Sequence, residues 1–342
     1  MNRNRRVAIA GLGPMGHRHL KALQLIEDIE LVAVADTRPQ ALASVVEDGV
    51  RKYADAAEMF AACRPDTVIV ATNAPSHRSL VLAAIASGAR GILCEKPIAC
   101  SIAEAEEMIL IAREHGCTLA VNHCRRHVPA YAWLAARLQS GEWGELRSIH
   151  SSWPGIGLGC SATHMIDLWR FLTGQELAAA YGWVDPVRGP NPRGSDYRDP
   201  GGMIVATSGT GARFIHEQIE DGAGPGTMVL ETTAAQIQVD EHQGSIHVCG
   251  RDLSIKPGPG RPPKYDPVQI PAEAQLMLDI IRLSGETLRE LVDGRDVTCS
   301  AANGLRSLEV IVAAHLSNRI RHGPVELPIT DLEAKKTWLP IT

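Results

Sequence analysis

The first third of the chain alternates short apolar runs with longer segments of helical periodicity. The apolar runs are rich in Val, Ile, Leu and Ala without regular polar alternation, and they lie at 7–10, 31–35, 67–71, 91–94 and 118–121. Helical patterns follow at 17–26, from 38 onward, at 76–87 and at 101–114, the last opening with a capping box, Ser101 and Glu104. Strands without a polar face are covered by helices on both sides, so this region predicts a parallel sheet of the α/β class.

After residue 122 the pattern changes to consecutive short strands. A helix is expected at 129–139, and strand candidates separated by Gly and Asp lie at 146–153, 201–206, 213–219, 228–231, 235–239 and 245–248. Loops rich in Pro, Gly and Arg are expected at 185–201 and 256–271, helices at 272–292 and 300–321, and a final strand at 325–328. Consecutive strands favour antiparallel pairing. The sequence therefore predicts two domains, 1–121 of α/β class and 122–342 of α+β class.

Composition narrows the classes of protein that this chain can be. Its 342 residues suggest two domains at about 150 residues each. Lys and Arg total 34 against 39 Asp and Glu, so the net charge of −5 gives no electrostatic reason to expect a nucleic-acid partner. No apolar run reaches the roughly 18 residues of a membrane helix, and no membrane partner is expected. The eight cysteines form no CxxC pair. We therefore expect free thiols in a reducing cytoplasm.

A glycine-rich loop lies between the first predicted strand and the first predicted helix. It reads Gly11-Leu-Gly13-Pro14-Met15-Gly16, a GxGxxG pattern. The first glycine permits a tight turn, the second lets the backbone approach a pyrophosphate, and the third lets helix and strand pack closely. The phosphates would bind the free N–H groups of the helix N-terminus. The alternative is a tight turn without a ligand, but the strand and helix on either side favour a Rossmann domain that binds a dinucleotide.

An acidic residue supports the same interpretation. Asp36 ends the second predicted strand 20 residues after Gly16, the spacing of a carboxylate that binds the adenosine ribose. A carboxylate there repels a 2′-phosphate, so NAD is the expected cofactor. Arg38 follows Thr37 and could instead neutralise a 2′-phosphate, which leaves NADP as the alternative cofactor.

At Glu95-Lys96-Pro97 the chain resembles a known family. A GxGxMG loop, with EKP after the fifth strand, is similar to the glucose–fructose oxidoreductase and inositol dehydrogenase family (Gfo/Idh/MocA). Four further segments resemble that family: Ala71-Thr72-Asn73-Ala-Pro75 followed by His77, His123-Cys-Arg-Arg126-His-Val-Pro129-Ala-Tyr131, Gly157 to Asp167 ending in an HxxD pattern, and the last helix and strand from Ser307 to Pro328. The resemblance spans most of the chain.

The resemblance implies a fold, an activity and an assembly. The fold is an N-terminal Rossmann domain followed by an α+β domain with an open, largely antiparallel sheet, which such proteins often use to form homodimers or homotetramers. The activity is NAD(P)-dependent hydride transfer at a carbinol carbon of a sugar, a cyclitol or a related small molecule. Two alternatives are an NAD-using glycosidase or lyase that oxidises its substrate transiently, and a non-catalytic redox sensor that binds a dinucleotide.

The same resemblance implies the residues of the site. Glu95 would bind the nicotinamide ribose, Lys96 would reach cofactor and substrate, and Pro97 would fix the turn through a cis bond. The expected cofactor-binding residues are Gly11, Gly13, Pro14, Met15, Gly16, Asp36, Thr37, Arg38, Thr72, Asn73, His77, Glu95 and Lys96. The expected substrate-binding residues are Lys96, His123, Arg126, His164 and Asp167.

Hydride transfer also needs a group that exchanges the hydroxyl proton. Lys96 and His164 are the expected catalytic residues, since a lysine shielded from water and a histidine both exchange protons at physiological pH. Asp167 lies one helical turn after His164 and could orient the substrate or the imidazole. Arg126 could hold a substrate oxygen or pair with a carboxylate. No metal is expected, because His123 and His127 come without a third ligand pattern.

One position departs from the family pattern. The family commonly has an aspartate four residues before the histidine of HxxD, where this chain has Cys160, and Ala162 replaces the usual glycine. A thiol does not substitute for a carboxylate at neutral pH. Either Lys96 and His164 suffice, another group supplies the base, or the reaction differs. The arginines between 188 and 200 could bind an anionic substrate, and the alternative is a solvated loop.

Overall fold

The computed structural model describes residues 5–155, 157–187, 189, 191, 193–251 and 264–341, and the chain packs as two compact units. Unit 1 comprises Met1–Cys124, Asp279–Leu308 and Lys335–Thr342, and unit 2 comprises Arg125–Leu278 and Glu309–Ala334. The expected division after residue 121 assigns all later residues to one domain, whereas unit 1 also contains two C-terminal segments. The expected loop at 256–271 lies outside the described residues as far as 263, and its described part contains a two-residue strand that the sequence missed, Asp266–Pro267.

The described part of unit 1 forms a parallel sheet in the order β3-β2-β1-β4-β5-β6. Its strands are β1 (Arg5–Ala10), β2 (Ile29–Ala35), β3 (Arg51–Tyr53), β4 (Thr67–Val70), β5 (Gly91–Cys94) and β6 (Thr118–Val121). All five strands expected here are confirmed, as is their parallel pairing. The sequence missed β3, which has three residues, of which two are exposed, and therefore no apolar run. The order is that of a Rossmann domain.

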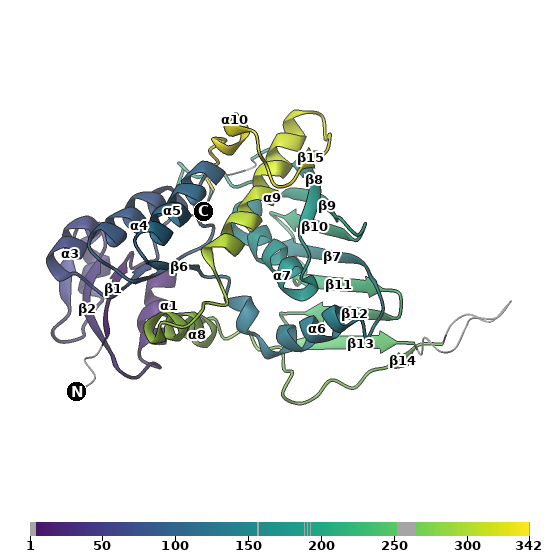
Figure 1. The fold of residues 1–342 in the computed structure, drawn as a ribbon, viewed down its shortest axis with the longest axis horizontal. Helices are drawn as coiled ribbons and strands as arrows, with labels where there is room; N and C mark the ends of the chain where they lie inside the picture. The colour runs from purple at the N-terminus through teal and green to yellow at the C-terminus, as the bar shows by residue number, and fades with distance from the viewer. Residues whose placement is uncertain are drawn as a thin grey trace. The chain divides into compact units, whose positions relative to one another are not determined.

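Helices cover both faces of this sheet (Figure 1). They are α1 (Pro14–Leu23), α2 (Pro39–Ala43), α3 (Ala56–Cys63), η1 (Ala74–Ser76), α4 (His77–Ala86), α5 (Ile102–Glu114) and α8 (Ile280–Asp293). The expected cap of α5 is present, with the Ser101 hydroxyl accepting from Glu104 N at 3.2 Å. The Glu104 carboxylate accepts from Cys100 N at 3.1 Å, one residue earlier than a standard capping box predicts.

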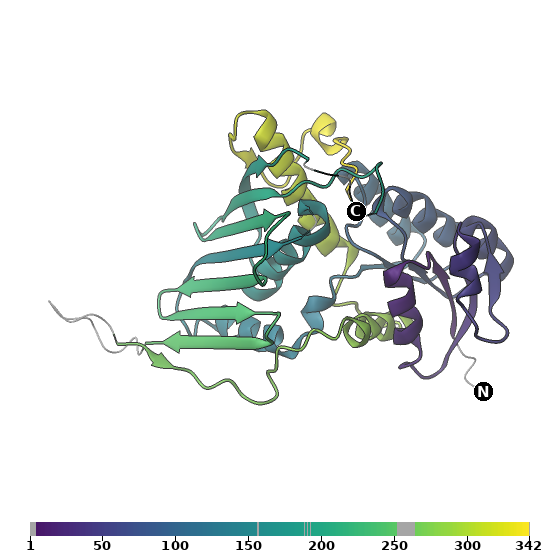
Figure 2. The same cartoon turned by 180° about the vertical axis from the view of Figure 1, so that it is seen from behind.

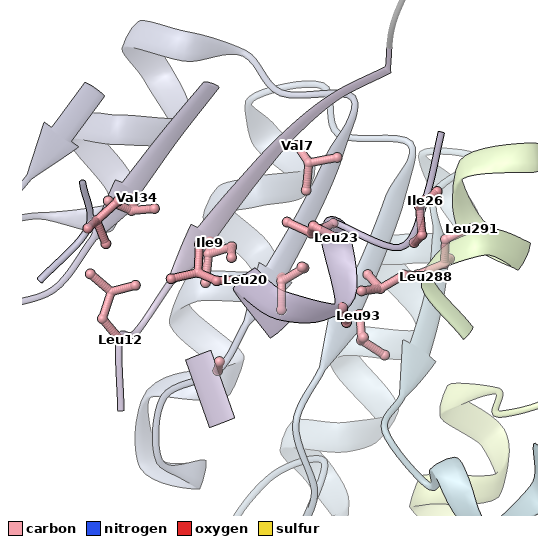
Figure 3. Packing of buried hydrophobic residues seen from close by; sticks show 14 of the residues in the cluster. Val7, Ile9, Leu12, Leu20, Leu23, Ile26, Val34, Leu93, Leu288 and Leu291 are labelled. Carbon is pink, nitrogen blue, oxygen red and sulfur yellow. The ribbon is translucent and has the colours of Figure 1, made fainter. Parts of the chain in front are cut away.

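Helix α8 packs against α1, β5 and β6 although it lies near the other end of the chain. Leu288 and Leu291 of α8 join Leu20 and Leu23 of α1 and Ile9 of β1 in one buried cluster (Figure 3). The expected start of this helix at 272 is wrong, because 272–279 are not helical and the Asp279 carboxylate caps the helix by accepting from Arg282 N at 3.2 Å. A C-terminal helix thus completes the core of the first unit.

The described part of unit 2 forms a sheet in the order β14-β13-β12-β11-β7-β10-β9-β8-β15. The strands are β7 (Leu146–Pro154), β8 (Leu177–Val184), β9 (Gly202–Ser208), β10 (Arg213–Ile219), β11 (Thr227–Thr232), β12 (Ala235–Asp240), β13 (Ser245–Gly250), β14 (Asp266–Pro267) and β15 (Val325–Glu326). Its pairs are antiparallel except for β7 with β10, which is parallel. The expected open, largely antiparallel sheet is confirmed. The sequence missed β8, whose Ala-rich start is weak in strand propensity.

One face of this sheet packs against helices α6 (Pro129–Ser140) and α7 (Thr163–Thr173) and the later part of α9 (Ala301–Arg319), as Figure 1 shows. Trp169 of α7 meets Phe214 of β10 edge to face, with ring centroids 6.1 Å apart. Figure 2 shows the opposite face, which carries no helix among the described residues. A short helix, α10 (Leu332–Lys335), lies near the end of the chain. None of the helices formed by the described residues combines the length and apolar character needed to cross a membrane.

Candidate active site

In unit 1 the expected cofactor residues gather at the carboxyl edge of the parallel sheet. Gly11, Asp36 and Glu95 follow directly after β1, β2 and β5, and Thr72 stands two residues beyond β4. The carboxyl ends of parallel strands lie at one edge of the sheet, which is where doubly wound folds bind ligands. The sheet order therefore brings together residues that the sequence spreads over more than 80 positions.

The glycine loop has the backbone that its sequence predicts. Gly11 has φ +96°, and a Cβ there would stand 2.6 Å from the carbonyl oxygen of Ala71. A Cβ on Gly16 would stand 2.1 Å from the carbonyl oxygen of Gly11, whereas a Cβ on Gly13 would meet nothing within 4 Å. Pro14 opens α1, and its N-cap Gly13 offers no side-chain cap. No atom outside the loop therefore lies within 4 Å of the Cβ position at Gly13, and the first-turn amides of α1, which include Met15, are of the kind that binds phosphate.

Asp36 is ionised and held in place at the end of β2. Its carboxylate accepts from Leu12 N at 2.8 Å, from Arg38 N at 2.9 Å and from both sides of the Arg38 guanidinium at 2.9 Å. Burial opposes the charge, but these hydrogen bonds outweigh it and lower the pKa of the Asp36 carboxyl to about 2. Thr37 lies between the two partners. Arg38 is largely exposed. The structure is therefore compatible with NAD, whose ribose hydroxyls Asp36 would bind, and with NADP, whose 2′-phosphate Arg38 would bind.

Replacing Asp36 with alanine should weaken the binding of NADH more than that of NADPH. The variant removes an acceptor for the ribose hydroxyls and frees Arg38 to pair with a 2′-phosphate. Fluorescence titration should show the Kd of NADH rising about tenfold, the effect of one hydrogen bond to a charged group. The Kd of NADPH should rise less. Asp48→Ala, at an exposed position of unit 1, is the matched control. Equal losses for the two cofactors would contradict the preference for NAD.

Glu95 is the second buried carboxylate at this edge. Its Oε1 accepts from His19 Nε2 and from Asn122 Nδ2, both at 2.8 Å, and Asn122 also donates to Ser284 Oγ at 3.1 Å. Burial would raise the pKa of Glu95, but His19, Lys96 and Asn122 together lower it to about 2. Oε2 lies 3.4 Å from Lys96 N. Two donors therefore fix one oxygen of an ionised carboxylate, and the other points toward the next residue.

The sequence missed His19, Asn122 and Ser284 as supports of Glu95. His19 carried a usable signal, because it lies three residues after Gly16 and therefore on the same inward face of α1. Asn122 follows β6 directly, as Glu95 follows β5. Ser284 had no signal, since it belongs to α8, far along the chain.

Lys96 and His77 define the neighbouring loops. Lys96 is partly exposed, and its bond to Pro97 is cis, as expected. The buried ring of His77 places Nε2 at 3.0 Å from the carbonyl oxygen of Thr72 and Nδ1 at 3.0 Å from that of Pro97. Burial lowers the pKa of His77, and the contacts with the carbonyl oxygens oppose this effect. His77 thus joins the loops after β4 and β5, which carry Thr72, Asn73 and Lys96.

In unit 2, helix α7 carries two of the expected residues. His164 lies in its first turn and is partly exposed, and Asp167 follows one turn later with only 1% of its side chain exposed. The Arg126 guanidinium contacts both oxygens of Asp167, with 2.8 Å from Nε to Oδ2 and from Nη2 to Oδ1. Of the two expectations for Arg126, the structure shows the pairing with a carboxylate. His123 belongs to unit 1, where its carbonyl oxygen accepts from Cys299 Sγ at 3.2 Å.

The segment before His164 is a π-helical turn, Leu158–Ala162, that contains Cys160. The carboxylate of Asp199 accepts from Gly159 N and Cys160 N, both at 2.7 Å. Arg193 Nη2 stands 3.5 Å from Cys160 Sγ. The loop expected at 185–201 is therefore not simply solvated: its exposed middle includes Arg193, while Asp199 and Pro200 are buried. The sequence singled out its arginines and missed Asp199.

A buried polar row crosses the helix-covered face of the sheet in unit 2. His216 Nδ1 lies 2.9 Å from Ser151 Oγ, and Nε2 lies 3.2 Å from Gln218 Oε1. Gln218 in turn donates to the Gly155 carbonyl oxygen at 3.0 Å. Burial lowers the pKa of His216 to about 4.

This histidine should make the chain sensitive to acid. The unfolded state takes up the proton near pH 6.5, but the folded state only near pH 4, so stability is lost as the pH falls between these values. The free energy of unfolding from urea titrations should drop by about 3 kcal/mol more from pH 7 to pH 4 in the wild type than in His216→Gln. Exposed His242→Gln is the control. A parallel pH dependence in wild type and His216→Gln would contradict this assignment.

Among the described residues, no group of three His, Cys, Asp or Glu side chains could hold a metal ion.

The parallel-sheet order, the glycine loop and the ionised carboxylates of Asp36 and Glu95 are together typical of a domain that binds a dinucleotide. Residues 5–123 match the model of an oxidoreductase family with an NAD-binding Rossmann fold, GFO_IDH_MocA. This match, which covers the Rossmann part of the chain, supports the resemblance to the Gfo/Idh/MocA family that the sequence motifs carry. NAD is the cofactor of this family, and the site fits it: the N-cap Gly13 offers no side-chain cap to the amides of α1, and the carboxylates of Asp36 and Glu95 are ionised.

Several characterised proteins are similar to this chain. The D-apiose dehydrogenase of Paraburkholderia graminis is 27% identical over 96% of this chain and 91% of its own length. The inositol 2-dehydrogenase of Streptomyces avermitilis is 33% identical over 51% of this chain, and the match spans about half of that enzyme, 54%. A levoglucosan dehydrogenase solved with NADH has the same fold, with a TM-score of 0.80 at 19% identity over 95% of this chain and 99% of that one.

Proposed function

We propose that this protein is an NAD-dependent dehydrogenase or reductase acting on a CH–OH group of a sugar, a cyclitol or a sugar derivative. The observation that carries the proposal is Glu95: a buried, ionised carboxylate with one oxygen fixed by His19 and Asn122, directly before Lys96. Such a carboxylate accepts hydrogen bonds from a ribose at low reorganisation cost. Bound NAD supplies a hydride acceptor, and everything else is positioning and proton exchange by the protein.

The proposed roles follow from where each side chain lies in its own unit. The loop Gly11–Gly16 and Asp36 bind the dinucleotide, helped by Thr37, Arg38, Thr72, Asn73 and His77. Lys96 Nζ takes the hydroxyl proton of the substrate, and the imidazole of His164 donates or accepts a hydrogen bond with the substrate. The remaining substrate contact comes from His123. Arg126 and Asp167 act mainly through their mutual ion pair, which holds helix α7.

The roles of the two domains are part of the same proposal. Residues 1–121 bind NAD, and 122–342 provide substrate binding and oligomerisation. Support for oligomerisation comes from the open face of the sheet in unit 2, where Met203, Val205 and Ile215 are partly exposed apolar residues. We propose a cytoplasmic homodimer or homotetramer joined through this face. Light scattering of the purified chain measures the assembly.

A substrate panel tests the proposed activity. The relatives act, by name, on D-apiose and inositol, so the panel contains aldopentoses, aldohexoses, sugar acids and cyclitols, each with NAD. We expect substrate-dependent formation of NADH, read from its absorbance. A glycosidase or lyase would give product without net NADH, and a redox sensor would bind NADH without turnover on any substrate. Either result would overturn the proposal.

A further inference from the structure

At position 160 the family pattern has an aspartate, whereas this chain has Cys160. A carboxylate from elsewhere in the chain, that of Asp199, accepts a hydrogen bond from the backbone N–H of Cys160. We propose that Asp199 is a positioning residue that holds the π-helical turn Leu158–Ala162, and thereby fixes His164 at the start of α7. This inference rests on the proposed role of His164 in the function above, and it goes beyond that role by naming the residue that orients His164.

Asp199 and the next residue, Pro200, accept short hydrogen bonds from consecutive backbone amides of the turn. Its Oδ1 accepts from Gly159 N and its Oδ2 from Cys160 N, each at 2.7 Å, and the carbonyl oxygen of Pro200 accepts from Leu158 N at 3.0 Å. One dipeptide therefore satisfies three successive amides. Asp199 is only 6% exposed. Hydrogen bonds to a buried carboxylate are roughly twice as strong as neutral ones, so this is a firm anchor for the turn.

Gly157 makes the approach of Asp199 feasible. A Cβ at position 157 would stand 1.9 Å from the carbonyl oxygen of Asp199 and 2.4 Å from its Cγ. Any larger residue would push the Asp199 segment away from the turn. The contact between Asp199 and the turn thus requires both a glycine at 157 and a carboxylate at 199.

The anchored turn leads without interruption into the helix that carries His164. The π-helical turn ends at Ala162, and α7 begins at the next residue, Thr163. A displacement of the amides of Gly159 and Cys160 therefore passes through continuous helical backbone to His164, four residues after Cys160. Misplacement of a catalytic group by about 1 Å can lower turnover by about a hundredfold.

Asp199 is assigned a positioning role and not a catalytic one. Each of its two oxygens already accepts from a backbone amide at 2.7 Å. A second residue of the same loop contacts Cys160, because Arg193 Nη2 lies 3.5 Å from the Cys160 thiol. The side chains of Asp199 and Arg193 thus both contact Cys160, the residue at which the chain departs from the family pattern.

A double-mutant cycle in the full-length protein with NAD tests the assignment. Asp199→Asn replaces one accepting oxygen with an amide group that repels a backbone N–H. We expect kcat to fall about 10- to 100-fold while the Kd of NADH is unchanged. In a His164→Ala background, Asp199→Asn should lower kcat no further, because the effect of Asp199 passes through His164. Asp196→Asn, an exposed acid three residues earlier, is the matched control and should match the wild type.

A second variant keeps the test independent of how well Asp199→Asn folds. Gly157→Ala retains the carboxylate but displaces it, and it should give the same loss and the same non-additivity with His164→Ala. Gly209→Ala is its control, since a Cβ there meets nothing within 4 Å. A general loss of structure would instead lower kcat equally in both backgrounds.

The outcomes separate this inference from the proposed function. If His164→Ala is impaired but the Asp199 or Gly157 variants lower kcat by the same factor with and without His164, the positioning role is wrong and the proposed function stands. Wild-type kcat in both Asp199→Asn and Gly157→Ala overturns the positioning role as well. If His164→Ala keeps the wild-type kcat, the proposed role of His164 fails, and this inference fails with it.

Discussion

Replacing Lys96 with alanine is expected to abolish turnover while leaving the Kd of NADH within about tenfold of the wild type. Lys96 follows the buried Glu95 directly, and its amine is the group that we assign to take the substrate proton. Loss of a positioned acid–base group lowers kcat by about 10²- to 10⁴-fold. Dinucleotide binding should persist because it depends mainly on the glycine loop and Asp36. Steady-state kinetics and fluorescence titration of NADH measure the two quantities.

Two further variants make the Lys96 result specific. Lys21→Ala changes an exposed lysine at the end of α1 and should leave kcat unchanged. Lys96→Arg keeps a positive charge, but a guanidinium does not act as a proton acceptor in proteins, so this variant should not restore turnover. Wild-type kcat in Lys96→Ala would exclude Lys96 as the proton carrier. A loss of NADH binding by more than a hundredfold would show that Lys96 serves the cofactor instead.

Replacing Arg126 with alanine should lower the free energy of unfolding by about 3 to 5 kcal/mol, the cost of breaking a buried ion pair. Arg126 and Asp167 are 9% and 1% exposed, and the guanidinium bonds to both carboxylate oxygens. Its removal leaves a carboxylate in an apolar helix face without this partner. Urea titration followed by circular dichroism gives the change in stability.

Matched variants distinguish burial from charge alone. Arg147→Ala removes an exposed partner of Glu145, and its effect should be under about 1 kcal/mol. The double variant Arg126→Met with Asp167→Leu removes the charge together with its partner, and it should be more stable than Arg126→Ala. If Arg126→Ala costs no more than Arg147→Ala, the pair does not hold helix α7.

Much of the fold could be predicted because the strongest signals are local. Apolar runs without polar alternation gave the five longer strands of the parallel sheet. The helix expected at 17–26 after the glycine loop is present as α1, three residues earlier at Pro14–Leu23. The assignment of α8 to the first unit could not be predicted, since its Leu288 and Leu291 contact residues more than 260 positions earlier in sequence. The parallel pairing of β7 with β10 depends likewise on sheet order, which short strand patterns do not determine.

In the candidate site, too, the residues of local motifs could be predicted and the residues distant in sequence could not. The EKP and HxxD motifs identify Glu95, Lys96, His164 and Asp167 because each motif is contiguous. The residues that orient them are distant in sequence: His19 lies 76 positions from Glu95, and Asp199 lies 39 from Cys160. A histidine in a helix or an aspartate in a loop has many roles, and only the fold shows which carboxylate or amide it meets.

The most direct test of the central claim is isotopic transfer to the cofactor. The best substrate from the panel, deuterated at the carbinol carbon that is oxidised, is incubated with NAD and the wild-type protein. Mass spectrometry of the recovered cofactor should show one deuterium per NADH formed, in amounts equal to the oxidised product. Product formed while NAD is recovered unreduced and unlabelled would contradict the account, because it would mean that the protein does not catalyse net hydride transfer.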